Sequence, residues 1–308
     1  MFRVFIGILV AAIFVFTRSG VSPAQTNESE NSSSQSIFGD GKTRLIIRVD
    51  DIGFTHAANL AMKKLAEEGC VTAASVMVTT PWLDEAVELL KQHPEISVGV
   101  HTCLNCEWMP YRWGPVSPVT EVPTLVDEWG KFFGSRQQLR DNNPNVDEVE
   151  KEIRAQVDLA LKKGLKISYM DHHMSAAVDT PAMRERFEKV AREYGLAISR
   201  WFGEKEGPAI YSVEPDKKAD FLLAEIEKLE SGNLYLMVGH PGMNTPELAV
   251  LKDIHPWAPQ NMSEHREAET NALCDPRFKE LLAKKGIELV GYDIIKEKYL
   301  DRMARPAE

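Results

Sequence analysis

Cysteine is scarce in this sequence, and runs of basic residues are absent. The 308 residues include only four cysteines, too few for the core to depend on disulfides. Lysine and arginine number 36 against 46 aspartate and glutamate residues, which gives a formal net charge of -10. Because nucleic-acid binding relies on clustered basic side chains, this balance argues against a nucleic-acid partner and favours a neutral or cationic ligand.

A glycine-rich phosphate loop and an internal repeat are also missing. No strand candidate is followed by the glycine-rich turn that cradles phosphates in doubly wound nucleotide-binding folds. An open doubly wound sheet stays an alternative architecture, but its commonest use is removed. Hydrophobic residues make up 44% of the chain and charged residues 27%, as in an ordinary folded protein with one barrel-sized domain.

An apolar run at the amino terminus has the features of an export signal. Arg3 precedes an apolar segment from Val4 to Phe16, and Ser22-Pro23-Ala24 offers a cleavage site. The segment is too short for a comfortable membrane span, so a cleaved signal is favoured over a retained anchor. We therefore predict an exported protein, periplasmic or extracellular, with a signal peptide cleaved near Ala24.

The sequence after this leader changes composition. Residues 25–42 are rich in Ser, Asn, Glu and Gly and contain few large apolar residues, so they are predicted to be a disordered linker. The folded domain is predicted to occupy residues 43–300, with residues 1–24 as the signal peptide.

The first strand candidate of this domain ends in two adjacent carboxylates. Leu45 to Val49 are mostly apolar and β-branched, as in a buried strand, and Asp50 and Asp51 follow directly. Catalytic groups gather at the carboxyl ends of strands in α/β barrels, and neighbouring carboxylates repel each other unless a cation relieves them. A metal site is one interpretation, and a turn that caps the next helix is the other.

Strand and helix patterns alternate along the rest of the domain. Further strand candidates lie at residues 71–78, 96–100, 166–170, 196–199, 234–238 and 287–290. Amphipathic helical patterns lie at residues 57–68, 81–92, 146–162, 182–194, 219–229 and 278–285. This order predicts an α/β fold with a parallel sheet, and right-handed crossovers favour a TIM-like (β/α) barrel that is distorted or incomplete.

Histidines follow three of these strands: His101, His173 and His240. Carboxylates and imidazoles at one edge of a sheet suit a divalent cation, zinc best, with magnesium or manganese as alternatives. Such a cation polarises an acyl oxygen and acidifies its water, while a carboxylate that does not bind the metal takes the proton. His240 is placed to protonate a leaving nitrogen, so metal-assisted hydrolysis of an amide or ester is predicted.

The segment between His101 and Gly134 is an aromatic-rich loop. Trp108, Tyr111 and Trp113 are predicted to bind substrate, because exposed aromatic faces stack on sugar rings; filling a satellite core is the alternative. Cys103 and Cys106 form a C-x-x-C pair, for which free or mutually bridged thiols are favoured over a structural zinc site.

The sequence resembles the YdjC/ChbG family of carbohydrate deacetylases over roughly Arg44 to Tyr292. The segments that carry the resemblance, in collinear order, are LIIRVDDIGF, VTAASVMV with PWLDEAVEL, VGVHTCLNCEW, YMDHHM, LAISR, LMVGHPG, and REAETNAL followed by GIELVGY. The resemblance implies a distorted TIM-like barrel, a divalent metal, and removal of acetyl groups from N-acetylated amino sugars such as chitooligosaccharides.

Carried over by position, the resemblance implies a specific set of site residues. It gives metal ligands Asp51, His101 and His173, with His172 as the alternative to His173; a catalytic base, Asp50; and two further site residues, His240 and Arg200. Arg200 is predicted to orient Asp50 or to bind substrate. Arg48 departs from the family pattern and is not expected to touch a ligand.

Three functions remain open at this stage. The first is a metal-dependent hydrolase that removes acetyl groups from N-acetylated sugars by attack of a metal-bound water. The alternatives are an exported carbohydrate-binding protein without turnover, and a different metal-dependent amidase or phosphoesterase on the same barrel. The predicted partner is an N-acetylated carbohydrate, with no stable membrane partner after cleavage and a homodimer as an open alternative. A base beside the metal speaks against a binder, which needs none.

Overall fold

The computed structural model describes residues 36–306, so the predicted signal peptide and residues 25–35 of the predicted linker lie outside the described residues. The described end of that linker contacts the folded domain. Phe38 packs edge-on against Tyr299, with ring centroids 4.8 Å apart, and the Arg44 guanidinium lies 4.0 Å from the Phe38 ring centre. Within the described residues, no helix combines the length and apolar character needed to cross a bilayer.

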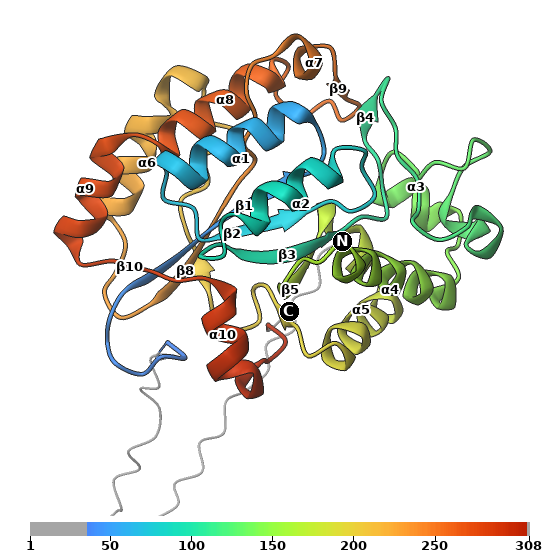
Figure 1. The fold of residues 1–308 in the computed structure, drawn as a ribbon, viewed down its shortest axis with the longest axis horizontal. Coiled ribbons are helices and arrows are strands. Elements are labelled where there is room, and N and C mark those ends of the chain that lie inside the picture. The colour runs from blue at the N-terminus through green and yellow to red at the C-terminus, as the bar shows by residue number, and fades with distance from the viewer. Residues whose placement is uncertain (1–35, 307–308) are drawn as a thin grey trace, which may run out of the picture. The chain divides into compact units, whose positions relative to one another are not determined.

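A parallel sheet forms the centre of the domain (Figure 1). Its strands run in the order β6–β5–β3–β2–β1–β8–β7, and β10 pairs with the start of β1. Their bounds are β1 (Arg44–Ile52), β2 (Ala73–Val76), β3 (Ser97–Thr102), β5 (Ile167–His172), β6 (Ala197–Ile198), β7 (Lys205–Glu206), β8 (Leu234–Gly239) and β10 (Glu288–Leu289). The sheet curls but does not close, because its end strands β6 and β7 do not pair with each other among the described residues. It therefore forms a half-barrel. This confirms the predicted incomplete TIM-like α/β fold.

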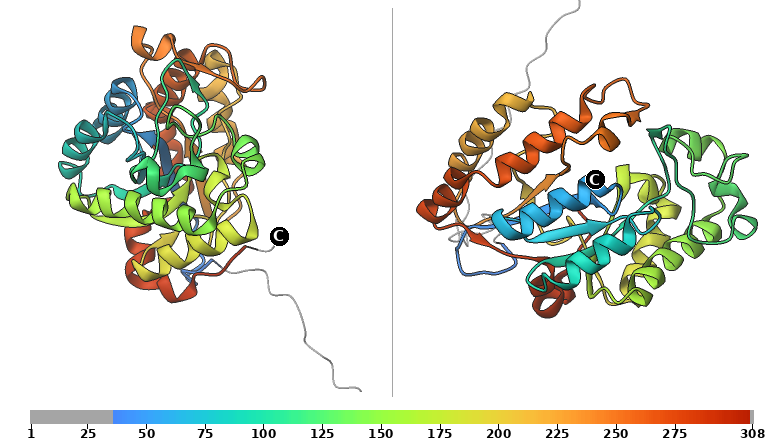
Figure 2. Two further views of the ribbon diagram at one scale, coloured as in Figure 1. Left: turned by 90° about the vertical axis from the view of Figure 1, so that its right-hand side faces the viewer. Right: turned by 45° about the horizontal axis from the view of Figure 1, so that its top comes forward.

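Helices cover the outer face of this half-barrel (Figures 1 and 2). The long ones are α1 (His56–Glu68), α2 (Leu83–Lys91), α4 (Val146–Lys162), α5 (Pro181–Glu193), α6 (Lys218–Glu227), α8 (Met262–Leu273) and α9 (Pro276–Lys285). All except α8 lie where the apolar periodicity predicts a helix.

Helix α8 escaped prediction because its buried face is polar. His265, Arg266, Glu269 and Thr270 are all buried there, so the apolar residues do not recur with a helical period. Such a face is stable only if its polar groups find partners, and two of these residues contribute to the site described below.

Helix α10 (Tyr292–Tyr299) closes the amino-terminal end of the sheet. The Lys296 ammonium donates to the carbonyl of Ile167 at 2.9 Å, and the Ser97 hydroxyl donates to Asp293 at 2.6 Å. Ile167 and Ser97 are the first residues of β5 and β3. Ligands therefore have to enter from the opposite end, where the strands finish.

That carboxyl end carries the remaining elements. An antiparallel ribbon joins β4 (Trp108–Met109) to β9 (Lys252–Asp253), and two short helices, α3 (Arg136–Asp141) and α7 (Pro246–Ala249), lie in the flanking loops. None of these elements was predicted, because each is too short for a hydrophobic period to show.

Candidate active site

A cavity of about 210 Å³ lies at the carboxyl ends of β1, β3, β5 and β8. Its lining includes seven residues that the sequence singles out as site residues: Asp50, Asp51, His101, Trp108, His172, His173 and His240. They come from five segments far apart in the chain, so the fold brings them together.

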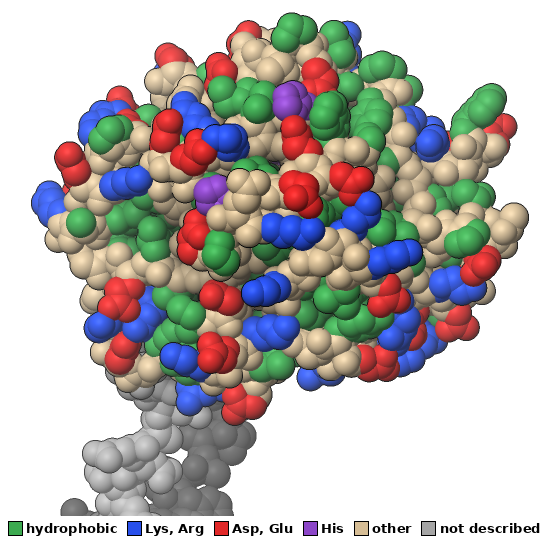
Figure 3. All heavy atoms as spheres, in the orientation of Figure 1, with side chains coloured by type: hydrophobic (Ala, Val, Ile, Leu, Met, Phe, Trp, Pro, Cys, Tyr) green, Lys and Arg blue, Asp and Glu red, His purple; other side chains and the backbone are tan. Residues whose placement is uncertain are grey.

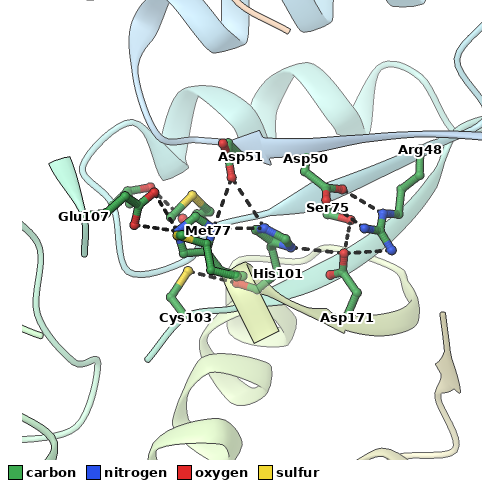
Figure 4. A network of polar contacts seen from close by, with 12 residues as sticks. Arg48, Asp50, Asp51, Ser75, Met77, His101, Cys103, Glu107 and Asp171 are labelled. Carbon is green, nitrogen blue, oxygen red and sulfur yellow. Dashed lines mark hydrogen bonds and ion pairs between the residues drawn. The ribbon is translucent and has the colours of Figure 1, made fainter. Parts of the chain in front are cut away.

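Asp51 and His101 point toward each other in the cavity (Figure 4), and with His173 they present single atoms to a common point. Asp51 Oδ1 lies 3.4 Å from His101 Nε2 and 3.4 Å from His173 Nδ1, and the two nitrogens are 3.3 Å apart. Ligand atoms bound about 2.1 Å from one ion at tetrahedral angles are separated by about 3.4 Å. The spacing therefore fits a divalent cation, and Asp51 Oδ1 is buried without a hydrogen-bond partner.

The backbone at the end of β1 separates the two neighbouring aspartates. Asp51 has φ of 64°, and the pairing of β1 with β2 shifts register between Val49 and Ile52. Asp tolerates this left-handed conformation better than most residues, but it still requires support from the surroundings. The turn directs Asp51 toward the imidazoles, while Asp50 stays on the inner face of the sheet beside Arg48.

Each imidazole is backed by a carboxylate on its other nitrogen. His101 Nδ1 lies 3.1 Å from Asp171 Oδ2, and His173 Nε2 lies 2.9 Å from Glu107 Oε2. A carboxylate in this position fixes the tautomer and the ring orientation of a metal-binding histidine. His173 is thus set to offer Nδ1, and His101, whose Nδ1 lies near Asp171 without a hydrogen bond, faces Asp51 with Nε2.

These contacts also shift the pKa values of the imidazoles. Burial lowers the pKa of His173, but the charge of Glu107 and the contact with Asp51 outweigh it and raise the pKa to about 9. The pKa of His101 is raised well above its ordinary value, because Asp171 and Asp50 outweigh burial. The surroundings favour positive charge at this point, as a proton or as a cation.

Arg266 from α8 holds the second oxygen of Asp51. Its Nη2 donates to Asp51 Oδ2 at 2.6 Å, and its guanidinium lies 5.2 Å from the Trp108 ring centre. Burial raises the pKa of Asp51, but Arg266 and the two imidazoles hold it well below the ordinary value. Asp51 therefore stays ionised, as a ligand must.

Asp50 has a different partner. Arg48 Nε donates to Asp50 Oδ1 and Arg48 Nη2 donates to Asp50 Oδ2, both at 2.7 Å. The two residues lie two positions apart on β1, so their side chains share one face of the strand. The third nitrogen, Nη1, donates to the Ser199 hydroxyl at 2.7 Å and lies 3.1 Å from Asp171 Oδ2.

The Arg48 network extends into the half-barrel through hydroxyl groups. Ser75 donates to Asp171 Oδ2 at 3.0 Å and contacts the Tyr169 hydroxyl at 2.8 Å. The Tyr169 ring lies flat against β3 because residue 99 is glycine; a Cβ there would stand 2.4 Å from the ring. Packing beneath the site thus fixes the polar groups above it.

The charges of these two networks leave a net negative excess. The buried carboxylates are Asp50, Asp51, Glu107 and Asp171, and the buried guanidiniums are Arg48 and Arg266. Four negative groups face two positive ones, so with neutral imidazoles the site carries two uncompensated negative charges. A buried excess of this size calls for a counter-charge, and a divalent cation supplies it.

His240 follows β8 and lines the same cavity. Its backbone N–H donates to Glu269 Oε2 at 2.7 Å, and its ring meets Tyr211 edge-on with centroids 5.1 Å apart. Nδ1 of His240 is buried without a hydrogen-bond partner. The imidazole is therefore fixed in place with one nitrogen uncommitted.

Arg200 does not reach this cavity. Its side chain is 38% exposed, forms an ion pair with Glu206 and lines a neighbouring cavity instead. The expectation that Arg200 orients Asp50 is corrected, because Arg48 makes that contact. Sequence position alone could not separate the two arginines, since both stand next to a strand end.

The remaining predicted residues divide between the cavity and its supporting layer. Trp108 lines the cavity, whereas Tyr111 and Trp113 pack around Phe54, with centroid distances of 6.1 and 5.6 Å, and are absent from the lining. Their contact with substrate stays a prediction, and their packing around Phe54 is the supporting position considered as the alternative for aromatic residues in this loop. His172 is partly buried, lines the cavity and meets Phe187 edge-on, and burial lowers its pKa to about 4.

The four cysteines are free. The Cys103 thiol donates to the carbonyl of His101 at 3.2 Å, and the Cys106 sulfur accepts the backbone N–H of Trp113 at 3.3 Å. Of the alternatives for the C-x-x-C pair, free thiols are the ones present. Burial raises the pKa of Cys106 to about 11, so this thiol stays protonated.

Sequence reasoning missed Arg48, Glu107, Arg266, Tyr211 and Trp257, the last four of which line the cavity. For Arg48 a signal existed, because a charged residue two positions before Asp50 in a buried strand needs a partner on the same face. Arg266 lies in the quoted REAETNAL segment, on a helix whose polar face hid it. Glu107 and Trp257 lie in irregular segments with no local pattern to mark them.

Comparisons with known proteins identify the family of this chain. The chain belongs to the YdjC-like family, because the family model for YdjC-like protein matches residues 44–284. A carbohydrate deacetylase of Brevibacillus brevis is 35% identical over 53% of this chain, and the match spans 62% of that relative's length. A carbohydrate deacetylase of Thermoanaerobacter pseudethanolicus is 27% identical over 82% of this chain and 99% of its own length.

A solved structure from Enterococcus faecalis, named for cellobiose-phosphate cleavage, has the same fold. Its TM-score is 0.68 at 23% sequence identity, and the match covers 82% of this chain and 99% of that one. At this identity the likeness shows the half-barrel alone.

The comparison overturns the prediction of export with cleavage near Ala24. Relatives from Thermoanaerobacter pseudethanolicus and Vibrio cholerae are matched over 99% and 96% of their own lengths by 82% of this chain. These carbohydrate deacetylases therefore have no counterpart of the apolar leader on which the prediction rested. Residues 1–35 lie outside the described part of the chain, so the structure adds no support for the leader.

Proposed function

We propose that this protein is a metal-dependent hydrolase that removes acetyl groups from N-acetylated amino sugars or oligosaccharides. The observation that carries the proposal is the equal spacing of Asp51 Oδ1, His101 Nε2 and His173 Nδ1, with a separate carboxylate beside them. Membership of a family whose curated relatives are named carbohydrate deacetylase supports the reaction class.

Asp51, His101 and His173 would hold the cation. Two imidazoles and one carboxylate favour zinc, with manganese next and magnesium less suited, because magnesium prefers oxygen ligands. When bound, such a cation supplies Lewis-acid chemistry, which polarises an acyl oxygen and acidifies water. Asp171 and Glu107 keep the outer nitrogens of the two imidazoles occupied.

Asp50 is the proposed base. Arg48 holds both of its oxygens, yet each carboxylate oxygen has a second lone pair, so Asp50 can still accept a proton from a water molecule in the cavity. The pairing fixes the orientation of the carboxylate. The same arginine restrains Asp171, so one guanidinium aligns the base and the support of His101.

His240 is the proposed acid. Cleavage of the amide requires a proton on the leaving nitrogen, and His240 lies in the cavity with Nδ1 uncommitted. Glu269 fixes the backbone of His240 and Tyr211 fixes its ring, so the imidazole is directed without being saturated. Asp50 would gain a proton as His240 loses one, which balances the overall hydrolysis.

Acetate release from N-acetylglucosamine oligomers tests this proposal. Purified protein should release acetate, lose activity after dialysis against a chelator, and recover it when zinc is restored. A carbohydrate-binding protein would bind the oligomers without releasing acetate. A different metal hydrolase would leave them untouched in both states, which would overturn the proposed substrate class.

Two earlier predictions need separate measurements. One is that the folded domain begins at residue 43 and ends at residue 300. The other is the homodimer. Neither affects the description of the site. Limited proteolysis and light scattering at known concentration measure them directly.

A further inference from the structure

An exposed tryptophan stands at the mouth of the active-site cavity. Trp257 lies in the loop after β9 and is 62% exposed, yet it belongs to the cavity lining together with Asp51, His173 and His240. Figure 3 shows hydrophobic side chains exposed on the part of the surface where Figure 1 places α7 and β9. Single exposed apolar residues are common, so exposure alone carries no argument.

What distinguishes Trp257 is that its position is fixed. The ring of His255 stacks on the indole with centroids 5.0 Å apart and an interplanar angle of 31°. His255 is itself held by Asp253, whose Oδ1 lies 2.7 Å from Nδ1 and accepts the His255 N–H at 2.8 Å. One face of the indole is thus backed by a tethered ring, while much of its surface stays in contact with solvent.

The cavity walls complete the setting. Trp108 and Tyr211 line the same space from two other segments, and His240 and the carboxylates lie deeper. A pyranose ring has apolar C–H faces and a polar rim of hydroxyl groups. Flat aromatic surfaces beside convergent polar groups match both features.

We propose that Trp257 is the stacking platform for a pyranose ring of the substrate, with His255 and Asp253 holding the indole in place. This inference rests on the proposed deacetylase function and assigns its sugar contact. It is separate from the prediction for Tyr111 and Trp113, whose rings pack around Phe54. Contact with Trp257 would bind the sugar equally in the ground state and the transition state, so its loss should act on KM.

The chain supplies a matched control. Trp129 is 75% exposed, lies in the aromatic loop and is absent from the cavity lining, so it shares the exposure of Trp257 without its location. Substituting either residue removes an exposed indole from the surface and should leave the fold and the metal content unchanged.

The experiment measures kcat and KM of the metal-loaded enzyme on an N-acetylglucosamine oligomer, together with sugar binding followed by tryptophan fluorescence. For Trp257→Ala, KM should rise roughly tenfold while kcat stays within about twofold, as expected for loss of one aromatic contact. Trp257→Phe should recover most of the affinity, and His255→Ala should raise KM by a smaller factor. Trp129→Ala should match the wild type.

The fluorescence change on sugar binding should disappear in Trp257→Ala and persist in Trp129→Ala. Turnover by the wild type with equal KM in both alanine variants would overturn the platform and leave the proposed function intact. Absence of both turnover and sugar binding in the wild type would overturn the two together.

Discussion

Two triads of potential metal ligands share His101 but have opposite surroundings. Asp51, His101 and His173 form one, and Asp50, His101 and Asp171 form the other; all are buried. In the second triad the Arg48 guanidinium already contacts Asp50 and Asp171, within 2.7 and 3.1 Å. In the first, Asp51 Oδ1 has no hydrogen-bond partner. Arg48 thus bridges two carboxylates of the second triad, whereas in the first, the open triad, Arg266 binds only Asp51 Oδ2 at 2.6 Å and leaves Oδ1 directed at the two imidazoles.

The comparison shows how neighbouring carboxylates acquire different roles. Asp50 and Asp51 are adjacent in sequence, and the positive φ of Asp51 is enough to direct them to different partners. Asp50 faces an arginine on its own strand, and Asp51 faces two histidines and an arginine from distant segments. A base must remain free of the metal and a ligand must not, so this separation is what the proposed reaction requires.

The largest effect is expected from removing His173, which belongs to the triad Asp51, His101 and His173 but not to the second triad. His173→Ala should weaken metal binding by more than about 100-fold, beyond the loss seen when only an outer partner of a ligand is removed, and turnover should fall to background. Calorimetric titration with zinc measures the affinity. Retention of one tightly bound zinc per chain would break the comparison.

Changing Asp50 should separate catalysis from metal binding. Asp50→Asn should lower kcat by about 10²- to 10⁴-fold, the usual contribution of a positioned base, and leave the zinc content unchanged. Steady-state kinetics and metal analysis on one preparation give both values. If zinc is lost together with activity, as in His173→Ala, then the two aspartates do not differ in role.

Arg48→Met should show how much the Arg48 guanidinium contributes to the free energy of unfolding. The substitution leaves Asp50 and Asp171 buried without their guanidinium, and removing one partner of a buried ion pair lowers the free energy of unfolding by about 3–5 kcal/mol. Urea unfolding of the zinc-loaded wild type and variant measures the difference. A loss below about 1 kcal/mol would mean that Arg48 is not essential to the charge balance of the second triad.

The smallest effect is expected at Arg200. Its ion pair with Glu206 is exposed, and such pairs contribute at most about 1 kcal/mol to stability. Arg200→Ala should leave zinc content and kcat close to the wild-type values, with Arg48→Met as the contrasting variant. A large loss of kcat with intact zinc would restore the role that sequence position suggested for Arg200.

The sequence predicted the fold well where local patterns carry the information. The apolar pattern of the sequence predicts strands such as β1 and helices such as α4. The histidines and aspartates that follow the strands lie together at one edge of the sheet. Helix α8 could not be predicted from apolar periodicity, because its buried face is polar. That face includes Arg266.

Contacts between distant irregular segments could not be predicted in the same way. Glu107 reaches His173 from the loop after β3, and Trp257 reaches the cavity from the loop after β9. Their positions depend on how the β4–β9 ribbon folds over the carboxyl end of the sheet. The residues around Glu107 and Trp257 form no sequence pattern from which these positions could be predicted.

Anomalous diffraction at the zinc edge from crystals of the zinc-loaded protein tests the central claim most directly. The account predicts one strong peak per chain within about 2.0–2.2 Å of Asp51 Oδ1, His101 Nε2 and His173 Nδ1, with Asp50 still bound to Arg48. A peak between Asp50, His101 and Asp171, or zinc bound only at sites that involve none of these residues, would contradict it.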